Sequence, residues 1–249
     1  MFLRLSLLGE RRGDRCSMQC AAPQEEDLNV RAIIVASGRP SGGEAWKSWV
    51  RTGDLIVGAD GGAAQALAWG LVPHVVIGDM DSLPEQARAG LASGGCEFIV
   101  HPRAKDETDL ELALSYVVER GSQEVIIFGA LGGRLDHTLA NLLLLALPRF
   151  ATAQIRIVDL PEEALLVRDG RSVTIEGLPG DLVSLLPLGG DAGGVTTAGL
   201  AWALDGDTLR FGSSRGVSNE LTISTARIAV EHGCLLVVHR VGGYHEENW

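Results

Sequence analysis

The chain has 249 residues and a formal net charge of −11. This length allows one large domain or two ordinary ones, with a sizeable apolar core. The charge argues against a nucleic-acid partner, because neutralising a phosphate backbone requires a basic surface, and no apolar stretch is long enough to span a membrane.

Residues 1–29 are predicted to be a disordered tail, or an over-extended start with the true initiation near Met18. A few leucines are followed at once by arginines and acidic residues, so the apolar part is too short for a signal peptide. The four cysteines of the chain lack the Cys-x₂-Cys spacing of a zinc site. We therefore expect reduced thiols and a cytoplasmic protein.

From residue 30 onward, short apolar runs alternate with segments of helical spacing. The strands are predicted at 30–36, 55–59, 74–77, 96–100, 125–128 and 155–158. Alternation of this kind predicts an α/β domain over 30–160, built as an open, mostly parallel sheet with helices on both faces.

The helices of this region differ in how clearly they are marked. The clearest carries an apolar stripe from Leu110 to Val118 and ends at Gly121. A second runs from Leu135 to the breaker Pro148. Shorter helices are expected around Trp46 and Ala63 and in a stretch that opens at Pro84, which suits a first helical position. Each of these predicted helices lies between two predicted strands.

After about residue 161 the pattern changes to short strands divided by glycines. These strands are predicted at 172–175, 182–186, 201–204, 208–211, 222–230 and 235–239. Between two of them, Asp205-Gly206 predicts a tight hairpin, because both central residues of a type I′ turn need positive φ. Residues 161–249 are therefore expected to form a small antiparallel β-sandwich domain.

Polar clusters follow each of the first five predicted strands. They are Ser37-Gly38, Asp60-Gly61-Gly62, Gly78–Ser82, His101–Asp109 and Gly129–His137. Open α/β sheets bind their ligands outside the carboxyl ends of their strands. The five clusters are therefore expected to surround one ligand site.

Two of these clusters are acidic and predict a magnesium–phosphate site. Carboxylates crowded at strand ends repel one another, and Mg²⁺ removes that cost where phosphates are the substrate. Asp79 and Asp81 are two residues apart, so extended backbone directs both to one side. Asp106 and Asp109 share a helix face, although acids in a first turn can simply cap a helix. A solvated turn is the alternative for the first pair.

The remaining polar residues have weaker signals. Asp60-Gly61-Gly62 either lets backbone N–H groups approach a phosphate or simply starts a helix. Lys105 and Arg134 can hold phosphates, and Asp136 can orient His137 or a ligand hydroxyl. From the local sequence alone, Trp202 is interpreted as an ordinary core residue of a hairpin.

At these residues the chain resembles the thiamine pyrophosphokinase family. The resemblance covers about 30–238 in the family's order. It is carried by Gly58–Gly62, Gly78–Ser82, Lys105–Asp109, Gly133–His137, Gly199–Trp202 and Ser218–Glu220. It implies an α/β nucleotide domain followed by a β-sandwich, and transfer of pyrophosphate from ATP to the thiamine hydroxyl with release of AMP. It also implies a homodimer with thiamine at the interface.

The resemblance assigns a role to each matching residue. Mg²⁺ and the triphosphate would be held by Asp79, Asp81, Asp106 and Asp109. Lys105 and Arg134 would lie near phosphate oxygens, with Asp136 and His137 lining the site. The nucleotide would be held by Ser37, Asp60, Gly61 and Gly62, with help from the same two cations. Thiamine would be contacted by Trp202, Ser218 and Asn219.

Two rival functions remain open at this point. A magnesium-dependent phosphatase of the haloacid-dehalogenase type would use Asp79-x-Asp81 as nucleophile and acid, although that pair follows the third strand here. A non-catalytic thiamine or nucleotide sensor would need no cluster of metal-binding acids. A kinase of the P-loop type is excluded, because the chain has no Gly-x₄-Gly-Lys-Ser/Thr.

Overall fold

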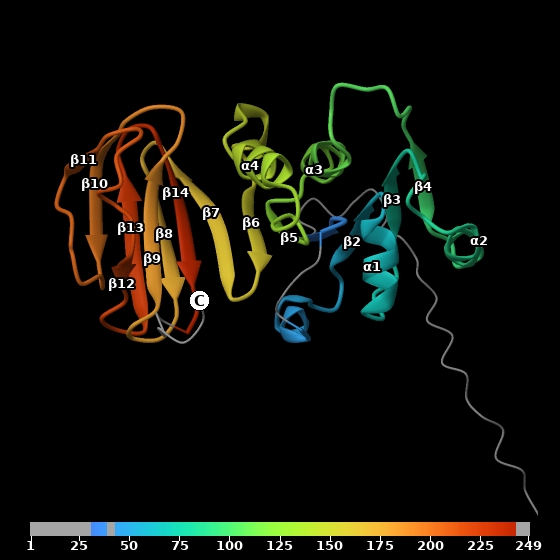
Figure 1. Ribbon diagram of the computed structural model, residues 1–249, viewed down its shortest axis with the longest axis horizontal. Helices are drawn as coiled ribbons and strands as arrows, with labels where there is room; N and C mark the ends of the chain where they lie inside the picture. The colour runs from blue at the N-terminus through green and yellow to red at the C-terminus, as the bar shows by residue number, and fades with distance from the viewer. Residues whose placement is uncertain (1–30, 39–42, 243–249) are drawn as a thin grey trace, which may run out of the picture.

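A computed structural model describes residues 31–38 and 43–242 of the chain, so the predicted tail at 1–29 lies outside the described residues. Figure 1 shows an elongated molecule with helices and strands toward one end and strands alone toward the other. The helix-bearing part contains six strands. They are β1 (Ala32–Val35), β2 (Leu55–Ala59), β3 (Val75–Gly78), β4 (Glu97–Val100), β5 (Glu124–Phe128) and β6 (Gln154–Asp159).

These six strands are parallel and stand in the order β6-β5-β1-β2-β3-β4. β1 and β2 consist entirely of buried residues, as expected for central strands covered on both faces. The helices between the strands are η1 (Ala45–Trp49), α1 (Gly62–Ala68), α2 (Glu85–Ser93), α3 (Asp109–Glu119), α4 (Leu135–Leu144) and η2 (Pro148–Phe150).

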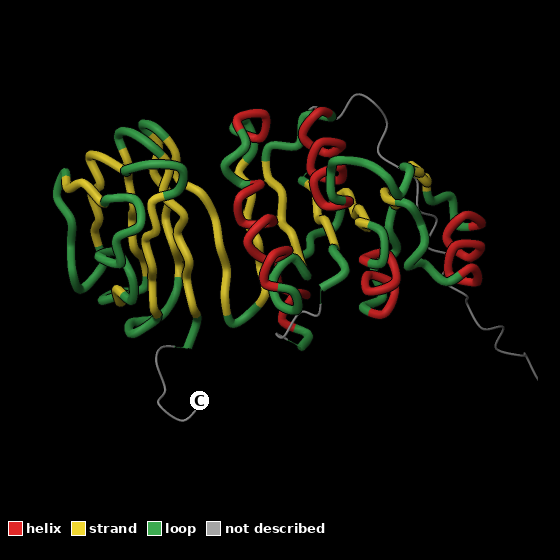
Figure 2. The backbone as a smooth tube through the Cα atoms, turned by 45° about the horizontal axis from the view of Figure 1, so that its top comes forward, coloured by secondary structure: helices red, strands yellow, loops and turns green. Residues whose placement is uncertain are grey.

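The helices cover both faces of this sheet, as Figure 2 shows. Ile34 of β1 packs in a core with Leu114 of α3, whereas its neighbour Ile33 packs with Ala66 of α1 on the opposite face. Successive strand residues point to opposite faces, so one strand contributes to both cores. The predicted α/β architecture is confirmed.

The ends of α3 follow the chemistry of their residues. The Thr108 hydroxyl caps the helix by accepting the Glu111 N–H at 3.2 Å. Gly121, just after the C-cap residue Arg120, has φ 87° and stops the helix as predicted. At α2 the prediction was off by one residue, since Pro84 is the N-cap residue and not the first helical one.

The second part of the chain is a β-sandwich without helices in its described residues. Its strands are β7 (Glu162–Arg168), β8 (Arg171–Glu176), β9 (Leu182–Pro187), β10 (Ala192–Ala198), β11 (Asp207–Leu209), β12 (Asn219–Glu220), β13 (Thr225–Val230) and β14 (Cys234–Arg240). One sheet has the order β12-β9-β14-β7 and the other β11-β10-β13-β8. Their facing side chains, such as Val237 and Ile228, form a separate apolar core, which confirms the predicted sandwich.

The two parts share one sheet. β7 pairs antiparallel with β6, so ten strands run without interruption from β12 to β4. The chain passes from one part to the other at residue 161, where the sequence places a domain boundary. The domain limits 30–160 and 161–249 stay a prediction, because a continuous sheet gives no break at which to test them.

Three details of the sandwich differ from the sequence-based expectation. Residues 201–204 are not a strand, and Asp205 lacks the positive φ of a type I′ turn. Instead, residues 201–204 form a loop. The N–H of its last residue, Leu204, donates to the Thr197 hydroxyl at 2.9 Å. Strands β7, β10 and β12 were not predicted. Gly193 and Gly194 weaken the strand signal of β10. Among the described residues, no helix is long and apolar enough to cross a membrane.

The start of α1 requires a glycine at position 62. A Cβ atom at Gly62 would lie 1.8 Å from the Val35 carbonyl oxygen of β1. Gly62→Ala should therefore lower the free energy of unfolding by about 3 kcal/mol, since the helix must move away from the sheet. Gly90→Ala is the control. Its Cβ would meet no atom within 4 Å, and it should stabilise α2 by about 1 kcal/mol. Denaturant unfolding compares the two, and equal effects would contradict the packing argument.

A buried histidine joins three elements of the sandwich. His239 of β14 is 1% exposed. Its Nδ1 lies 2.9 Å from Glu163 Oε1 on β7, and its Nε2 lies 3.2 Å from Asp181 Oδ2 in the β8–β9 loop. Burial alone would lower the pKa of His239, but the two carboxylates raise it above the ordinary 6.5. Burial also opposes ionisation of Glu163 and Asp181, yet their hydrogen bonds hold both pKa values below the ordinary 4.5 and 3.8.

This network should make stability depend on pH in both directions. The contribution of His239 is complete below pH 6.5 and is lost as pH rises through its raised folded-state pKa. The carboxylates contribute fully above pH 4.5 and lose their contribution as pH falls through their lowered pKa values. Unfolding measured from about pH 5 to about pH 9 should show an alkaline decline that His239→Gln removes. The exposed His232→Gln should retain the decline; loss of it there would contradict the assignment.

Candidate active site

A cavity of about 530 Å³ lies at the carboxyl ends of the parallel strands. Its lining comes from the segments that follow β1, β2, β3, β4 and β5 and from the start of α4. The lining includes Ser37, Gly38, Asp60, Asp79, Arg103, Lys105, Glu107, Thr108, Asp109, Gly129, Gly132, Gly133, Arg134, His137 and Asn141. The structure thus brings together residues of all five polar clusters, because parallel strands present their carboxyl ends at the same edge.

Glycines let the loops around this cavity approach closely. The Gly38 N–H donates to the Gly129 carbonyl at 2.9 Å, and a Cβ at Gly38 would lie 2.3 Å from that oxygen. A Cβ at Gly78 would lie 2.8 Å from the Asp60 Cβ and 3.1 Å from Asp109 Oδ1. Because Gly78 at the end of β3 has no side chain, Asp60 and Asp109 have room beside it.

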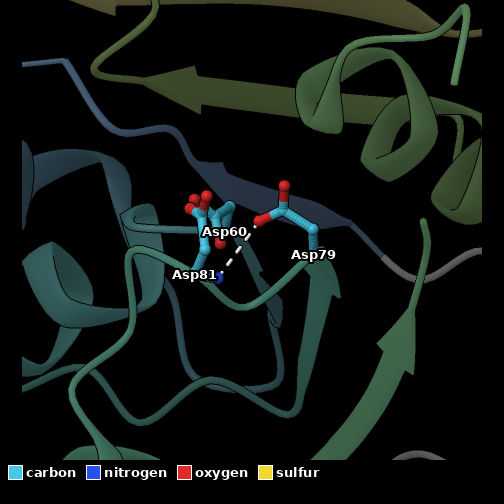
Figure 3. A group of neighbouring side chains, drawn as sticks. All are labelled: Asp60, Asp79 and Asp81. Carbon is cyan, nitrogen blue, oxygen red and sulfur yellow. Dashed lines mark hydrogen bonds between the residues drawn. The ribbon is translucent and has the colours of Figure 1, made fainter. Parts of the chain in front are cut away.

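Three aspartates lie close together at the carboxyl ends of β2 and β3. Figure 3 shows Asp60, Asp79 and Asp81 with their carboxylates turned toward one another. One oxygen from each lies within 4.8 Å of the others. Asp79 Oδ1 accepts the Asp81 N–H at 3.1 Å, and this bond is the main cause that lowers the pKa of Asp79, with Lys105 and Arg103 adding to it. Asp79 is therefore an anion at neutral pH.

The geometry of this acidic group fits a cation. Asp60 is 6% exposed, and its buried Oδ1 has no hydrogen-bond partner among the described residues. A buried carboxylate oxygen without a partner is costly, and a hard divalent ion that prefers oxygen ligands would satisfy it. Asp79 and Asp81 do lie together as predicted, but by a turn and not by extended backbone, since Met80 between them has φ 64°.

Backbone strain marks both predicted ligand regions. In the described residues, the non-glycine positions with positive φ are Asp60, Met80 and Ser218. Each of them lies in a cluster that the sequence singled out. Left-handed backbone is costly for residues with a side chain and gathers at functional sites. The strain therefore supports these clusters as sites.

Among the described residues, three cations line the cavity, and each is paired with an acid. Lys105 Nζ lies 2.9 Å from Asp109 Oδ1. Arg134 makes two hydrogen bonds with Asp136, at 2.6 and 3.1 Å, and this pair lowers the pKa of Asp136 to about 2. Arg103 lies 3.7 Å from Asp81 Oδ2. The cavity thus combines acids for a metal ion with cations for phosphate.

Several residues from the sequence analysis stand outside the cavity lining. Asp81 is one of them, although its carboxylate joins the acidic group of Asp60 and Asp79. Asp106 is exposed, away from the group formed by Asp60, Asp79 and Asp81. Gly61 and Gly62 serve close packing near Ser37 and Val35. Asp136 faces Arg134 and so orients that guanidinium instead of His137.

Sequence reasoning missed three residues of the lining. Arg103 and Glu107 lie inside the polar segment 101–109, where no local pattern separates them from the neighbouring charged residues. Asn141 donates to the Ala130 carbonyl at 2.7 Å and so holds the loop after β5. Its position four residues after His137 places both on one helix face, and that spacing was the available signal.

The predicted thiamine residues lie in the sandwich. Trp202 is 61% exposed, so its interpretation as a hairpin core residue is wrong. Its backbone N–H donates to Asn219 Oδ1 at 3.0 Å, and Asn219 Nδ2 donates back to its carbonyl at 2.7 Å. Asn219 thereby holds the Trp202 backbone in place. The N–H of Ser218 donates to the Ser184 hydroxyl at 3.1 Å.

The cavity and the exposed tryptophan lie far apart in one chain. Asn219 belongs to β12 at one edge of the ten-stranded sheet, and Asp60 follows β2 near the other. Five steps of strand order separate β12 from β5, the nearest strand whose following loop lines the cavity, and seven separate it from β2. At about 4.8 Å per step, these are roughly 24 and 34 Å. Figure 1 shows β12 within the sandwich and β2 within the helix-bearing part. A small molecule cannot span either distance.

Comparison with known proteins assigns both parts of the chain to one family. Residues 46–158 match "Thiamin pyrophosphokinase, catalytic domain", and residues 172–235 match "Thiamin pyrophosphokinase, vitamin B1 binding domain". The chain is 30% identical to thiamine pyrophosphokinase of Bacillus subtilis (strain 168) over 184 residues, which are 74% of this chain and 86% of the relative.

Solved structures agree with this result. The crystal structure of thiamine pyrophosphokinase from Bacillus subtilis superposes with a TM-score of 0.74 at 28% identity, covering 85% of this chain and 99% of the other. A thiamin pyrophosphokinase family protein from Enterococcus faecalis gives a TM-score of 0.72 at 28% identity, covering 84% and 98%. The likeness extends across both the α/β part and the sandwich.

Proposed function

Because this chain belongs to the thiamine pyrophosphokinase family, we propose that it transfers the pyrophosphoryl group of ATP to the hydroxyl of thiamine, giving thiamine diphosphate and AMP. The chain is a transferase of the kinase class with thiamine and ATP as its substrates. The observation that carries the proposal is the cavity that combines Asp60 and Asp79, two of the grouped aspartates, with Lys105 and Arg134.

The acidic group is the proposed magnesium site. We assign Asp60, Asp79 and Asp81 as ligands, because their oxygens converge and Asp60 Oδ1 has no other partner. Asp109 lines the same cavity and completes the acidic wall. Asp106 is not assigned as a ligand, because its carboxylate is not part of this converging group. Bound there, Mg²⁺ would neutralise charge on the transferring group and on the departing AMP.

The cations and glycines of the cavity would position the phosphates. Phosphoryl-type transfer depends mainly on positioning and charge stabilisation. Asp136 fixes the Arg134 guanidinium, whose flat fork can hold two phosphate oxygens. Lys105 supplies a second positive charge. His137 and Asn141 of α4 line the cavity on the side of that helix. Ser37 and the backbone beside Asp60 would hold the nucleotide.

We further propose that the enzyme is a homodimer with thiamine at the interface. Trp202 and Ser218 lie too far from the cavity of their own chain to touch a substrate there, so a second copy must supply them. On α4, beside the cavity, Leu135, Leu139 and Leu143 are 72%, 52% and 55% exposed. Their spacing of four places them on one helix face, and an exposed apolar stripe favours a protein partner.

The proposed thiamine contacts follow from this arrangement. Thiamine carries a permanent positive charge on its thiazolium ring, and the exposed indole of Trp202 can stack against such a ring. Asn219 positions the tryptophan backbone, as its two hydrogen bonds indicate. The acidic cavity would attract the same cation. The cytoplasmic location and the lack of a nucleic-acid partner stay predictions from composition and charge.

One assay tests the proposed reaction directly. The full chain is incubated with ATP, Mg²⁺ and thiamine, and the products are separated by chromatography. AMP and thiamine diphosphate should appear in equal amounts, and neither should form without thiamine. Release of inorganic phosphate from monoesters, with an adduct on Asp79, would support the phosphatase instead. Tight thiamine binding without turnover would support the sensor. The family matches favour neither alternative.

A further inference from the structure

Among the cations that the described residues place in the cavity, Arg103 is held differently from Lys105 and Arg134. Lys105 and Arg134 lie 2.9 and 2.6 Å from their carboxylates. Arg103 Nη1 lies 3.7 Å from Asp81 Oδ2, beyond hydrogen-bond distance, and its side chain is 86% exposed. Arg103 therefore lines the cavity without a close bond that fixes its guanidinium there.

The partner of Arg103 belongs to the acidic group. Asp81 supplies one of the three oxygens that lie within 4.8 Å of one another. The charge of Arg103 also acts on Asp79 and contributes to its lowered pKa. A guanidinium beside these carboxylates neutralises charge that a divalent ion would otherwise neutralise. Arg103 and a metal ion consequently compete for Asp81.

We propose that Arg103 is a further nucleotide-binding residue, which neutralises Asp81 in the metal-free protein and moves onto phosphate oxygens when a divalent cation and the nucleotide bind. The inference rests on the proposed function, because it takes the cavity to be the nucleotide site. It gives the described part of the cavity two arginines from different loops, since Arg103 precedes α3 and Arg134 precedes α4.

The physical chemistry of the pair suits such an exchange. An exposed ion pair contributes little and is easily broken, so leaving Asp81 is inexpensive. A guanidinium can bind two phosphate oxygens at once and is less strongly hydrated than an ammonium. Arg103 stands on the β4–α3 loop, two residues before Lys105, so the loop would present both cations to one phosphate chain.

The test measures two binding reactions that need no turnover. Binding of Mn²⁺ alone is followed by the electron paramagnetic resonance signal of the free ion. Binding of Mg²⁺ with α,β-methylene-ATP is followed by calorimetry, because this analogue cannot undergo cleavage between its α and β phosphorus atoms. In Arg103→Gln, Mn²⁺ should bind about threefold more tightly, while the nucleotide analogue should bind about tenfold more weakly.

Two matched variants separate a direct contact from a general change in charge. Arg210→Gln removes the same charge from an exposed site on the sandwich and should change neither affinity. Arg103→Lys keeps the positive charge but loses the planar guanidinium that can bind two phosphate oxygens at once. Its Mn²⁺ affinity should therefore equal that of the natural protein, and its nucleotide affinity should lie between those of Arg103→Gln and the natural protein. In an Asp81→Asn background, Arg103→Gln should no longer strengthen Mn²⁺ binding.

The outcomes distinguish this inference from the proposed function. Unchanged Mn²⁺ affinity in Arg103→Gln, or unchanged nucleotide affinity, overturns the inference even if the natural protein makes thiamine diphosphate. If the natural protein makes no thiamine diphosphate but both affinities shift as expected, the proposed reaction is wrong and the role of Arg103 as a nucleotide contact stands.

Discussion

Asp79→Asn is expected to reduce kcat by about a thousandfold while leaving the fold unchanged. The amide keeps the shape of the carboxylate, and its oxygen can still accept the Asp81 N–H that Asp79 Oδ1 accepts now. The substitution therefore removes the charge and one metal ligand without removing the turn. Turnover is measured as AMP formed from ATP and thiamine, and Mn²⁺ binding should weaken in parallel.

The control for this variant is Asp205→Asn. Asp205 lies in the exposed loop before β11 and lines no part of the cavity, so the same chemical change should leave kcat and Mn²⁺ binding unaltered. Circular dichroism and thermal unfolding should be alike for both variants and the natural protein. If Asp79→Asn keeps a rate within about threefold of the natural protein, the proposed metal role of Asp79 is wrong.

Mixing two inactive variants is expected to restore activity if the active site is shared between two copies of the chain. Asp79→Asn damages the cavity, and Trp202→Ala damages the proposed thiamine contact. In a mixed dimer, one site joins the intact cavity of one chain to the intact tryptophan of the other, and the second site carries both defects. Random exchange makes half of the dimers mixed, so about a quarter of natural activity should return.

The design of this experiment excludes simpler explanations. Each variant alone should be nearly inactive at low thiamine concentration, and Trp202→Ala should weaken thiamine binding far more than ATP binding. A mixture of Asp79→Asn with Arg134→Gln serves as the control, because both changes damage the same cavity. In each mixed dimer of that control, both sites stay defective. Recovery in the control, or none in the Trp202 mixture, would refute the shared site.

Much of the α/β part follows from local sequence patterns. The run at 55–59 predicted β2 to the residue, and the stripe from Leu110 to Val118 predicted α3 together with its stop at Gly121. These elements are buried or half-buried, so the period of their apolar residues reports directly on which backbone buries them. The sandwich was less predictable, because glycines interrupt β10 and the exposed loop at 201–204 mimics a strand.

The sequence predicted that the polar clusters meet at the strand ends and that Asp79 and Asp81 lie together, but not that Asp60 joins them. Sequence spacing grouped Asp106 with Asp109, whereas the structure groups Asp60 with Asp79 and Asp81. The reason is the neighbouring order of β2 and β3, together with the left-handed backbone at Asp60 and Met80. Neither feature has a local signal, since strand order depends on the whole sheet and strained residues persist only where their surroundings hold them.

The sequence by itself determined the fold class, the family and the residue types of the candidate site, because apolar periodicity and strand-end motifs are local properties. Only the tertiary structure decided which acids meet, that Trp202 is exposed, and that the cavity and the tryptophan lie at different parts of one continuous sheet. Such distances depend on how strands far apart in sequence are ordered and paired, and no local pattern contains that information.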